Sequence, residues 1–402
     1  MKILIGGVPF GCNNVGDEAI LECVINILRG IKPDAEITVS THDPVETQKK
    51  LGVRTCELMG FDFPYDRASM ERELREHDVF LWCGATGLSD YPEIPLQLLR
   101  IAKSAHRKVI LWGVGMNRHL NPAKYKVLPG KRRTLLLGIQ FLTLGLVDAI
   151  ALREMRCERK VRAQIAQDLT SADLIVVRDP ESRTELLNCG VDHEIEVGAD
   201  SALTLAPAAW DSIPLTEAAN SFLTSRGRKI GVCISTASPH FKDLPGLVRW
   251  LDLLVEEQQA KLLFLPMDPI TDLELMTDLR SKMRLREETF VLHGRYEPAE
   301  ILGLLPRLDL IVTSRLHLLI LSSIANVPFV GISCGSKVDN FLHQHGLHAP
   351  TSVDECDFAS LNRETQRLLS DSEFRATGML ATRELLLKRL QRSILRLKEV
   401  LG

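Results

Sequence analysis

Short apolar runs alternate along the chain with longer segments whose apolar residues recur at helical spacing. Residues 3–5 form the first such run, and segment 17–29 then repeats apolar residues every three or four positions. Further apolar runs follow at residues 37–39, 79–82, 109–112 and 174–177, with helical segments such as 96–105 between them. Short apolar strands that alternate with helices indicate a parallel, doubly wound sheet.

A second α/β series begins after a change in composition at about residue 207. Residues 207–228 are rich in small and polar residues, and the series continues with apolar runs at 230–233, 262–265, 290–292, 308–312 and 329–332. Beyond residue 358 the pattern is helical to the end. We therefore predict two Rossmann-like doubly wound domains at residues 1–206 and 229–357, a linker at 207–228 and C-terminal helices at 358–402.

Segment 135–152 is almost wholly apolar and has basic flanks. Gln140, Thr143 and Asp148 interrupt it, and Lys or Arg residues stand at 131–133, 153, 156, 159 and 160. We favour a helix that is buried in the protein or in a homo-oligomer contact. Peripheral docking of residues 131–160 on an anionic membrane is a second interpretation. A membrane-spanning helix is the least favoured, because the run is at the lower limit of about 18 residues.

Composition narrows the class of protein. The net charge of −3 gives no global attraction for nucleic acid. Nine cysteines are scattered without a Cys-x-x-Cys pair, which favours a reducing compartment, and no signal peptide precedes the first strand. We expect a cytoplasmic protein, with the inner face of the membrane as an open alternative. No His, Cys, Asp and Glu cluster has metal-site spacing, and Asp268 and Asp272 are isolated in the sequence.

The most informative turn is Thr313-Ser314-Arg315-Leu316-His317, between an apolar strand and an apolar helix. Such turns face the ligand crevice of an α/β sheet, and the start of a helix attracts anions. Arg315 adds a fork of donors for a carboxylate or phosphate, and His317 exchanges a proton near neutral pH. An anion clamp beside a proton donor indicates chemistry on a small acidic substrate. His293, which ends another strand of this domain, is a rival imidazole.

Two other loops contain candidate residues, each of which has both a ligand-binding and a structural interpretation. Asp17 and Glu18 begin the first helix, where they either contact sugar hydroxyls or complement the helix dipole, and Asn14 is equally typical of a turn. Arg178 follows a buried strand, where it either binds a ligand or forms a surface ion pair. Gly115 follows a strand too, which is a weak signal alone.

With these pieces in order, the chain resembles the polysaccharide pyruvyltransferase family over most of its length. The resemblance rests on five elements, namely Cys12-Asn13-Asn14-Val15-Gly16-Asp17-Glu18-Ala19-Ile20-Leu21, Arg178-Asp179 with Ser182, Ala199-Asp200-Ser201-Ala202, Ser314-Arg315-Leu316-His317, and Pro328, Gly331, Ile332, Lys337 and Val338. It implies a fold like that of GT-B glycosyltransferases. It also implies transfer of pyruvyl from phosphoenolpyruvate onto two hydroxyls of a glycan or lipid-linked sugar, with a ketal formed and phosphate released.

Residue roles follow from the resemblance. His317, Arg315 and Asp17 would be catalytic, with His317 delivering a proton to the enol methylene. The donor would be bound by Arg315, His317, Arg178, Ser314 and Lys337. The acceptor would be bound by Asn14, Asp17, Glu18, Gly84 and Gly115. Neither a metal nor a cofactor is expected, because phosphoenolpyruvate is itself the donor substrate.

Two departures from the family pattern concern the acceptor. The loop Cys83-Gly84-Ala85-Thr86-Gly87-Leu88 stands where many members have a run of glycines, and the apolar segment 135–152 is not part of the pattern. Two alternatives stay open, the first resting on the GT-B-like architecture alone and the second on these departures. One is a GT-B glycosyltransferase that uses a nucleotide sugar, and the other is a non-catalytic, membrane-associated member of the family.

Overall fold

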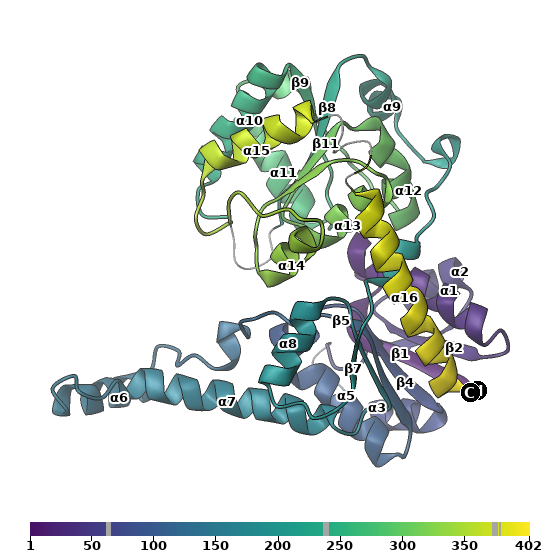
Figure 1. The fold of residues 1–402 in the computed structure, drawn as a ribbon, viewed down its shortest axis with the longest axis vertical. Coiled ribbons are helices and arrows are strands. Elements are labelled where there is room, and N and C mark those ends of the chain that lie inside the picture. Colours follow the sequence, from purple (N-terminus) through teal and green to yellow (C-terminus); the bar gives the residue numbers. More distant parts are fainter. Residues whose placement is uncertain (62–65, 236–240, 372–376, 378) are drawn as a thin grey trace. The chain divides into compact units, whose positions relative to one another are not determined.

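The computed structural model describes residues 1–402 apart from 62–65, 236–240, 372–376 and 378. Contacts within the chain divide it into two compact units (Figure 1). Unit 1 comprises Met1–Pro9, Lys32–Val197 and Arg396–Gly402, and unit 2 comprises Phe10–Ile31 and Gly198–Leu395. Each unit contains its own parallel sheet.

Unit 1 is built on a seven-stranded sheet of order β3-β2-β1-β4-β5-β6-β7. Its strands are β1 (Lys2–Phe10), β2 (Glu36–Thr41), β3 (Arg54–Glu57), β4 (Val79–Cys83), β5 (Lys108–Val114), β6 (Leu174–Val177) and β7 (Ile195–Val197). The central pairing is parallel, with Ile3 opposite Val79 and Ile110 opposite Leu174. Its helices are α2 (Pro44–Leu51), α3 (Arg67–Glu76), α4 (Gly87–Asp90), α5 (Glu93–Ser104), α6 (Lys131–Leu142), α7 (Ala149–Leu169) and α8 (Pro180–Asn188), with a 3₁₀ turn η1 (Pro122–Lys124).

Unit 2 is built on a five-stranded parallel sheet of order β10-β9-β8-β11-β12. Its strands are β8 (Arg228–Cys233), β9 (Ala260–Phe264), β10 (Thr289–Val291), β11 (Leu310–Thr313) and β12 (Phe329–Gly331). Its helices are α1 (Val15–Ile31), α9 (Glu217–Thr224), α10 (Leu244–Gln258), α11 (Thr271–Lys282), α12 (Pro298–Leu304), α13 (Leu316–Ile324), α14 (Ser336–Gln344), α15 (Phe358–Ser370) and most of α16 (Leu380–Leu401). Its 3₁₀ turns are η2 (Ser201–Thr204), η3 (Trp210–Ser212), η4 (Arg286–Glu288) and η5 (Leu305–Arg307).

The alternating apolar pattern produces the expected α/β fold in both units. The central strands β4 and β11 are buried along their whole length, as strands covered on both faces must be. In unit 2 the strand order reverses between β8 and β11, and ligands bind α/β sheets at such switch points. The short edge strands β3 and β7 were not predicted, because Arg54–Glu57 and Ile195–Val197 carry little apolar signal.

The two units do not follow the continuous boundaries expected from the sequence. Residues 10–31, which include all of α1, group with unit 2, although they lie in the first half of the chain. The buried face of α1 contains Ala19, Leu21, Val24 and Leu28. Val15 at its start donates a backbone hydrogen bond to Met267 of unit 2 at 2.9 Å. At the other end of the chain, α16 contributes its last turns to unit 1.

The prediction that segment 135–152 is a helix buried in this chain is wrong. The segment forms two helices: α6 ends at Leu142, and α7 begins at Ala149. No residue of α6 is buried, and its main packing is against α7. Both helices extend away from the sheet of unit 1 (Figure 1). In the part of the chain that the structure describes, no helix combines the length and the apolar character that crossing a bilayer requires.

Candidate active site

The loops that follow β8 and β11 are tied together at the switch point of unit 2. The Thr313 hydroxyl donates to the Cys233 carbonyl at 2.8 Å, and the Ser314 hydroxyl accepts from the Ser235 backbone N–H at 2.8 Å. Ser314 is almost fully buried. Its side chain therefore joins two loops at the edge where ligands of α/β sheets bind.

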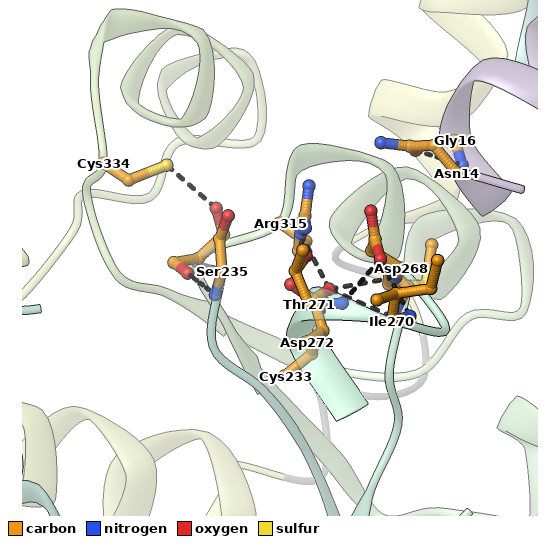
Figure 2. A network of polar contacts seen from close by, with 12 residues as sticks. Asn14, Gly16, Cys233, Ser235, Asp268, Ile270, Thr271, Asp272, Arg315 and Cys334 are labelled. Carbon is orange, nitrogen blue, oxygen red and sulfur yellow. Dashed lines mark hydrogen bonds and ion pairs between the residues drawn. The ribbon is translucent and has the colours of Figure 1, made fainter. Parts of the chain in front are cut away.

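Arg315 is held by a buried carboxylate. Its Nε and Nη2 donate to the two carboxylate oxygens of Asp272 at 2.9 and 2.5 Å (Figure 2). The Asp272 side chain is fully buried, and it also accepts backbone N–H groups from Met267 and Asp268. A bidentate pair with a braced carboxylate fixes the plane of the guanidinium. Nη1 takes no part in this pair.

The same carboxylate sets the charge of Arg315. Burial alone would lower the pKa of this guanidinium, but the charge of Asp272 and its hydrogen bonds raise the pKa above the ordinary value. Arg315 is consequently a permanent cation with 17% of its side chain exposed. A fixed, partly exposed cation at the start of α13 is suited to bind an anion.

The imidazole of His317 lies between a carboxylate and a glycine. Its Nε2 is 3.6 Å from Oδ2 of Asp200, and it makes no hydrogen bond among the described residues. On the Nδ1 side, a Cβ placed on Gly16 would lie 2.0 Å from Nδ1. Only glycine therefore fits at position 16 while the ring occupies this place. Asp200 itself is fixed, because its Oδ1 caps η2 through the Ala202 N–H at 3.0 Å.

The start of α1 brings Asn14, Asp17 and Glu18 to unit 2. Asn14 caps the helix, since its Oδ1 accepts the N–H groups of Gly16 and Asp17 at 3.0 and 3.4 Å (Figure 2). Glu18 accepts the backbone N–H of Gly11 at 2.8 Å and so holds the preceding turn. Asn14 and Glu18 thus have structural tasks that position the first turn of α1.

Asp17 has an unusual environment for a carboxyl group. Burial raises the pKa of Asp17 above its ordinary value, and the neighbouring charge of Asp200 adds to that rise. The positive charges of His317, Lys337 and Arg315 oppose it. Asp17 therefore shares one electrostatic cluster with the three basic residues of unit 2 that the sequence singled out. A carboxyl group with a raised pKa in such a cluster is typical of acid–base catalysis.

A second group of candidate residues lies in unit 1, where β4, β5 and β6 end. Gly115 donates its N–H to the Ala85 carbonyl at 2.8 Å, and Gly84 donates to the Trp112 carbonyl at 2.8 Å. A Cβ on Gly115 would lie 2.7 Å from Nη2 of Arg178, so this guanidinium packs directly on the glycine. Arg178 is buried, with its Nε 3.7 Å from a carboxylate oxygen of Asp179.

Comparison with known proteins assigns the family. A sequence model of the family described as polysaccharide pyruvyl transferase matches residues 14–336. The chain belongs to this family. The match covers both halves of the chain, as the paired motifs predicted, and the protein is accordingly a transferase of polysaccharide biosynthesis. No curated protein matches the sequence.

Solved structures similar to this pyruvyl transferase family member share its fold. The Anabaena protein HepE (Alr3699), solved with UDP and glucose, is 14% identical, with a TM-score of 0.61 over 100% of this chain and 99% of that one. MnaA from S. aureus, solved with UDP, is 11% identical, with a TM-score of 0.59 over 94% and 90%. A UDP-GlcNAc 2-epimerase from Neisseria meningitidis, bound to UDP-GlcNAc, is 12% identical, with a TM-score of 0.57 over 98% and 100%. The prediction of a GT-B-like fold with a C-terminal helical segment is confirmed.

The predicted site residues of this family member fall into two groups. Unit 2 contains Asn14, Asp17, Glu18, Ser314, Arg315, His317 and Lys337, and unit 1 contains Gly84, Gly115 and Arg178. The rival His293 is exposed and is absent from the charged groups around Asp17. In the described part of the chain, no three His, Cys, Asp or Glu residues are grouped to hold a metal ion.

Sequence reasoning gave no role to two carboxylates of the site. Asp272 lies 43 positions before Arg315, and no local pattern connects the two residues. Asp200 was visible inside the Ala199-Asp200-Ser201-Ala202 element, and that motif was the signal that could have paired it with His317. Both act on residues that had been predicted, since Asp272 orients Arg315 and Asp200 faces His317.

Proposed function

We propose that the protein transfers the pyruvyl group of phosphoenolpyruvate onto two hydroxyls of a glycan or lipid-linked sugar. The product is a pyruvyl ketal, and inorganic phosphate is released. One observation carries the proposal: Asp17, His317, Arg315 and Lys337 form a single charged cluster in unit 2 of a polysaccharide pyruvyl transferase family member. No cofactor beyond the donor is part of the proposal.

The donor is a small anion with a carboxylate and a phosphate, and the cluster offers matching cations. Arg315 presents Nη1 while Asp272 holds the rest of its fork. Lys337 lies in the first turn of α14 and His317 in the first turn of α13, where free N–H groups favour negative charge. Arg178 and Ser314 stay as further predicted donor contacts.

His317 supplies the proton that activates the enol. Asp200, 3.6 Å from Nε2, orients the imidazole, and histidine is the side chain that exchanges a proton near neutral pH. Protonation of the methylene carbon gives a methyl group and an oxocarbenium centre, which a sugar hydroxyl attacks. The phosphate then leaves, and a second hydroxyl closes the ketal. Of the two hydroxyl protons, one balances the proton on the methyl carbon and the other leaves with phosphate.

Asp17 is the residue of α1 that is suited to take a proton from the attacking hydroxyl. Its raised pKa makes the carboxylate a stronger base than an ordinary Asp. Glu18 is the weaker candidate, because its carboxylate already accepts the Gly11 N–H. Contacts of the acceptor with Asn14, Gly84 and Gly115 stay predictions.

Acceptor-dependent release of phosphate from phosphoenolpyruvate tests the proposal. The protein is incubated with the donor and a panel of glycans and lipid-linked sugars, and donor binding is measured separately by calorimetry. We expect phosphate release with at least one acceptor. The absence of both phosphate release and donor binding across a broad panel would exclude this function.

Matched variants test the residue roles. We expect His317→Ala to retain donor binding and to lose about 10²–10⁴-fold in kcat. Arg315→Lys keeps the charge but loses the fork, so donor binding should weaken while Asp272 keeps a cationic partner. His293→Ala, in an exposed histidine of the same unit, is the control and should behave as wild type. Normal turnover in both site variants would show that the assignment is wrong.

A nucleotide-sugar donor is the second candidate, because HepE and MnaA share this fold and were solved with UDP. Thermal unfolding with each donor distinguishes the two. A ligand at 100 times its Kd stabilises the folded state by about 2.7 kcal/mol. A shift with UDP-sugars and none with phosphoenolpyruvate would favour a glycosyltransferase. If neither donor changed the Tm and no turnover were measured, a non-catalytic role would be favoured.

A further inference from the structure

The helical arm of unit 1 exposes an apolar tip that nothing in the described chain covers. The arm consists of α6, the turn 143–148 and the first half of α7, and it extends away from the sheet of unit 1 (Figure 1). At the tip, Phe141, Leu142, Leu144 and Leu146 are 81%, 82%, 89% and 88% exposed. Residues 134–147 contain no charged side chain. Contiguous apolar surface of this kind marks an interaction site.

Basic residues lie on both helices behind this tip, at the start of α6 and along α7. Residues 131–160 contain seven Lys or Arg and three Asp or Glu, a formal charge of +4 in a chain whose net charge is −3. The acids are engaged within the fold: Asp148 caps α7 through the Ala151 N–H, Glu154 accepts the Val127 N–H, and Glu158 pairs with Arg162. Because the basic residues outnumber these acids by four, the net charge of residues 131–160 is positive.

A basic pocket lies at the base of the arm. It has a volume of about 740 Å³ and lies between η1, the loop 125–130 and the two helices. Its charged lining is Lys124, Lys126, Lys131, Arg132 and Arg153, and its apolar lining includes Leu135 and Leu136. A pocket that combines several cations with apolar walls fits a phosphate group attached to a hydrocarbon body.

We propose that this arm docks on an anionic lipid bilayer, with the tip inserted at the interface and the basic residues against lipid phosphates. The arm lies in the surface rather than spanning it, since the 12 residues of α6 extend only about 18 Å against a hydrocarbon core of about 30 Å. An apolar segment with basic flanks is typical of interfacial helices. Two copies of the arm would bring their positive charges together, which disfavours self-association, and a charge-free apolar tip does not suit nucleic acid.

Flotation of the full-length protein with vesicles tests the proposal independently of enzymatic activity. Vesicles of phosphatidylcholine with phosphatidylglycerol are compared with vesicles of phosphatidylcholine alone, at low and at high salt. We expect binding to the anionic vesicles only and a marked loss at high salt, because surface charges are screened over about 10 Å at 0.1 M. No binding to anionic vesicles, or equal binding to both kinds, would overturn the proposal.

Variants at exposed positions show whether the arm, rather than another part of the surface, binds the vesicles. The quadruple variant Phe141→Ser, Leu142→Ser, Leu144→Ser, Leu146→Ser and the double variant Arg132→Glu, Arg133→Glu should each reduce partitioning at least about tenfold. Val45→Ser, a 78% exposed apolar residue of α2, and the double variant Lys49→Glu, Arg75→Glu control for composition and charge. The control variants should bind as wild type does.

Light scattering in solution tests whether a second copy of the chain covers the tip instead of a membrane. We expect a molecular mass that the quadruple tip variant leaves unchanged, together with loss of vesicle binding by that variant. A dimer that the tip variant converts to a monomer, without vesicle binding by wild type, would show that a second copy covers the arm and would overturn the proposal.

Discussion

Asp17 is a carboxyl group whose pKa is raised by burial, and its titration predicts a measurable pH dependence. Burial holds the pKa of Asp17 above 3.8, so the unfolded chain releases this proton at a lower pH than the folded protein does. Ionisation of Asp17 therefore lowers the free energy of unfolding. The loss begins as the pH rises past 3.8 and is complete above the pKa of the folded state.

We predict that Asp17→Asn removes this loss. The Tm of the variant minus that of wild type should be smallest in acid and should grow as the pH rises to neutrality, while turnover falls because the base is gone. Thermal unfolding and phosphate release measured over the same pH series check both effects. Asp34→Asn, at an exposed carboxylate, controls for the change of charge. A Tm difference that shrinks with rising pH would contradict the raised pKa.

At the scale of elements, the first turns of α1 and α13 contact each other through Gly16 and His317. Gly16 is in the first turn of α1, and the His317 ring lies in the space that any side chain at this position would need. Glycine inside a helix normally costs about 1 kcal/mol relative to alanine. This glycine is explained by the close approach of the imidazole rather than by the needs of the helix.

We predict that one substitution lowers both stability and activity. The Cβ of Gly16→Ala would overlap Nδ1, Cγ and Cβ of His317, so overpacking should outweigh the gain in helix propensity and cost about 1–3 kcal/mol. The displaced imidazole should also lower kcat, since a misplacement of about 1 Å costs about 100-fold. Gly30→Ala is the matched control in the same helix, because no atom lies within 4 Å of the added Cβ. Thermal unfolding and kcat are measured for both variants. Wild-type turnover in Gly16→Ala would show that His317 need not occupy the place seen here.

The sequence predicted elements and motifs well, because both depend on local patterns. Apolar runs located the central strands, and the strand-to-helix turn located Arg315 and His317 at a switch point. Pairings across long separations could not be read in the same way. Nothing near Asp272 indicates Arg315, since their contact exists only after β9 and β11 share a sheet. The arm was misjudged for a related reason: an apolar pattern shows that a surface is apolar, but not what covers it.

At the scale of the whole molecule, the chain is divided into units that are discontinuous in sequence. The first helix, α1, belongs to unit 2, and the strand just before it, β1, belongs almost wholly to unit 1. The site depends on this arrangement, because α1 contributes Asp17 and Gly16 to a cluster whose other members come from residues 198–395. A division at residue 206 would have separated Asp17 from His317.

We predict that α1 unfolds with unit 2 rather than with the strand that precedes it. Backbone amides within one cooperative unit share a free energy of opening, which hydrogen exchange in low concentrations of urea measures. The amides of α1 should therefore follow those of β8 and β11, while the amides of β1 follow those of β4 and β5. The buried residues of α1, such as Leu21 and Val24, explain the coupling, because opening unit 2 exposes them. If α1 exchanged together with β1 and β4 instead, Asp17 would belong energetically to unit 1, and its place beside His317 would have to be reconsidered.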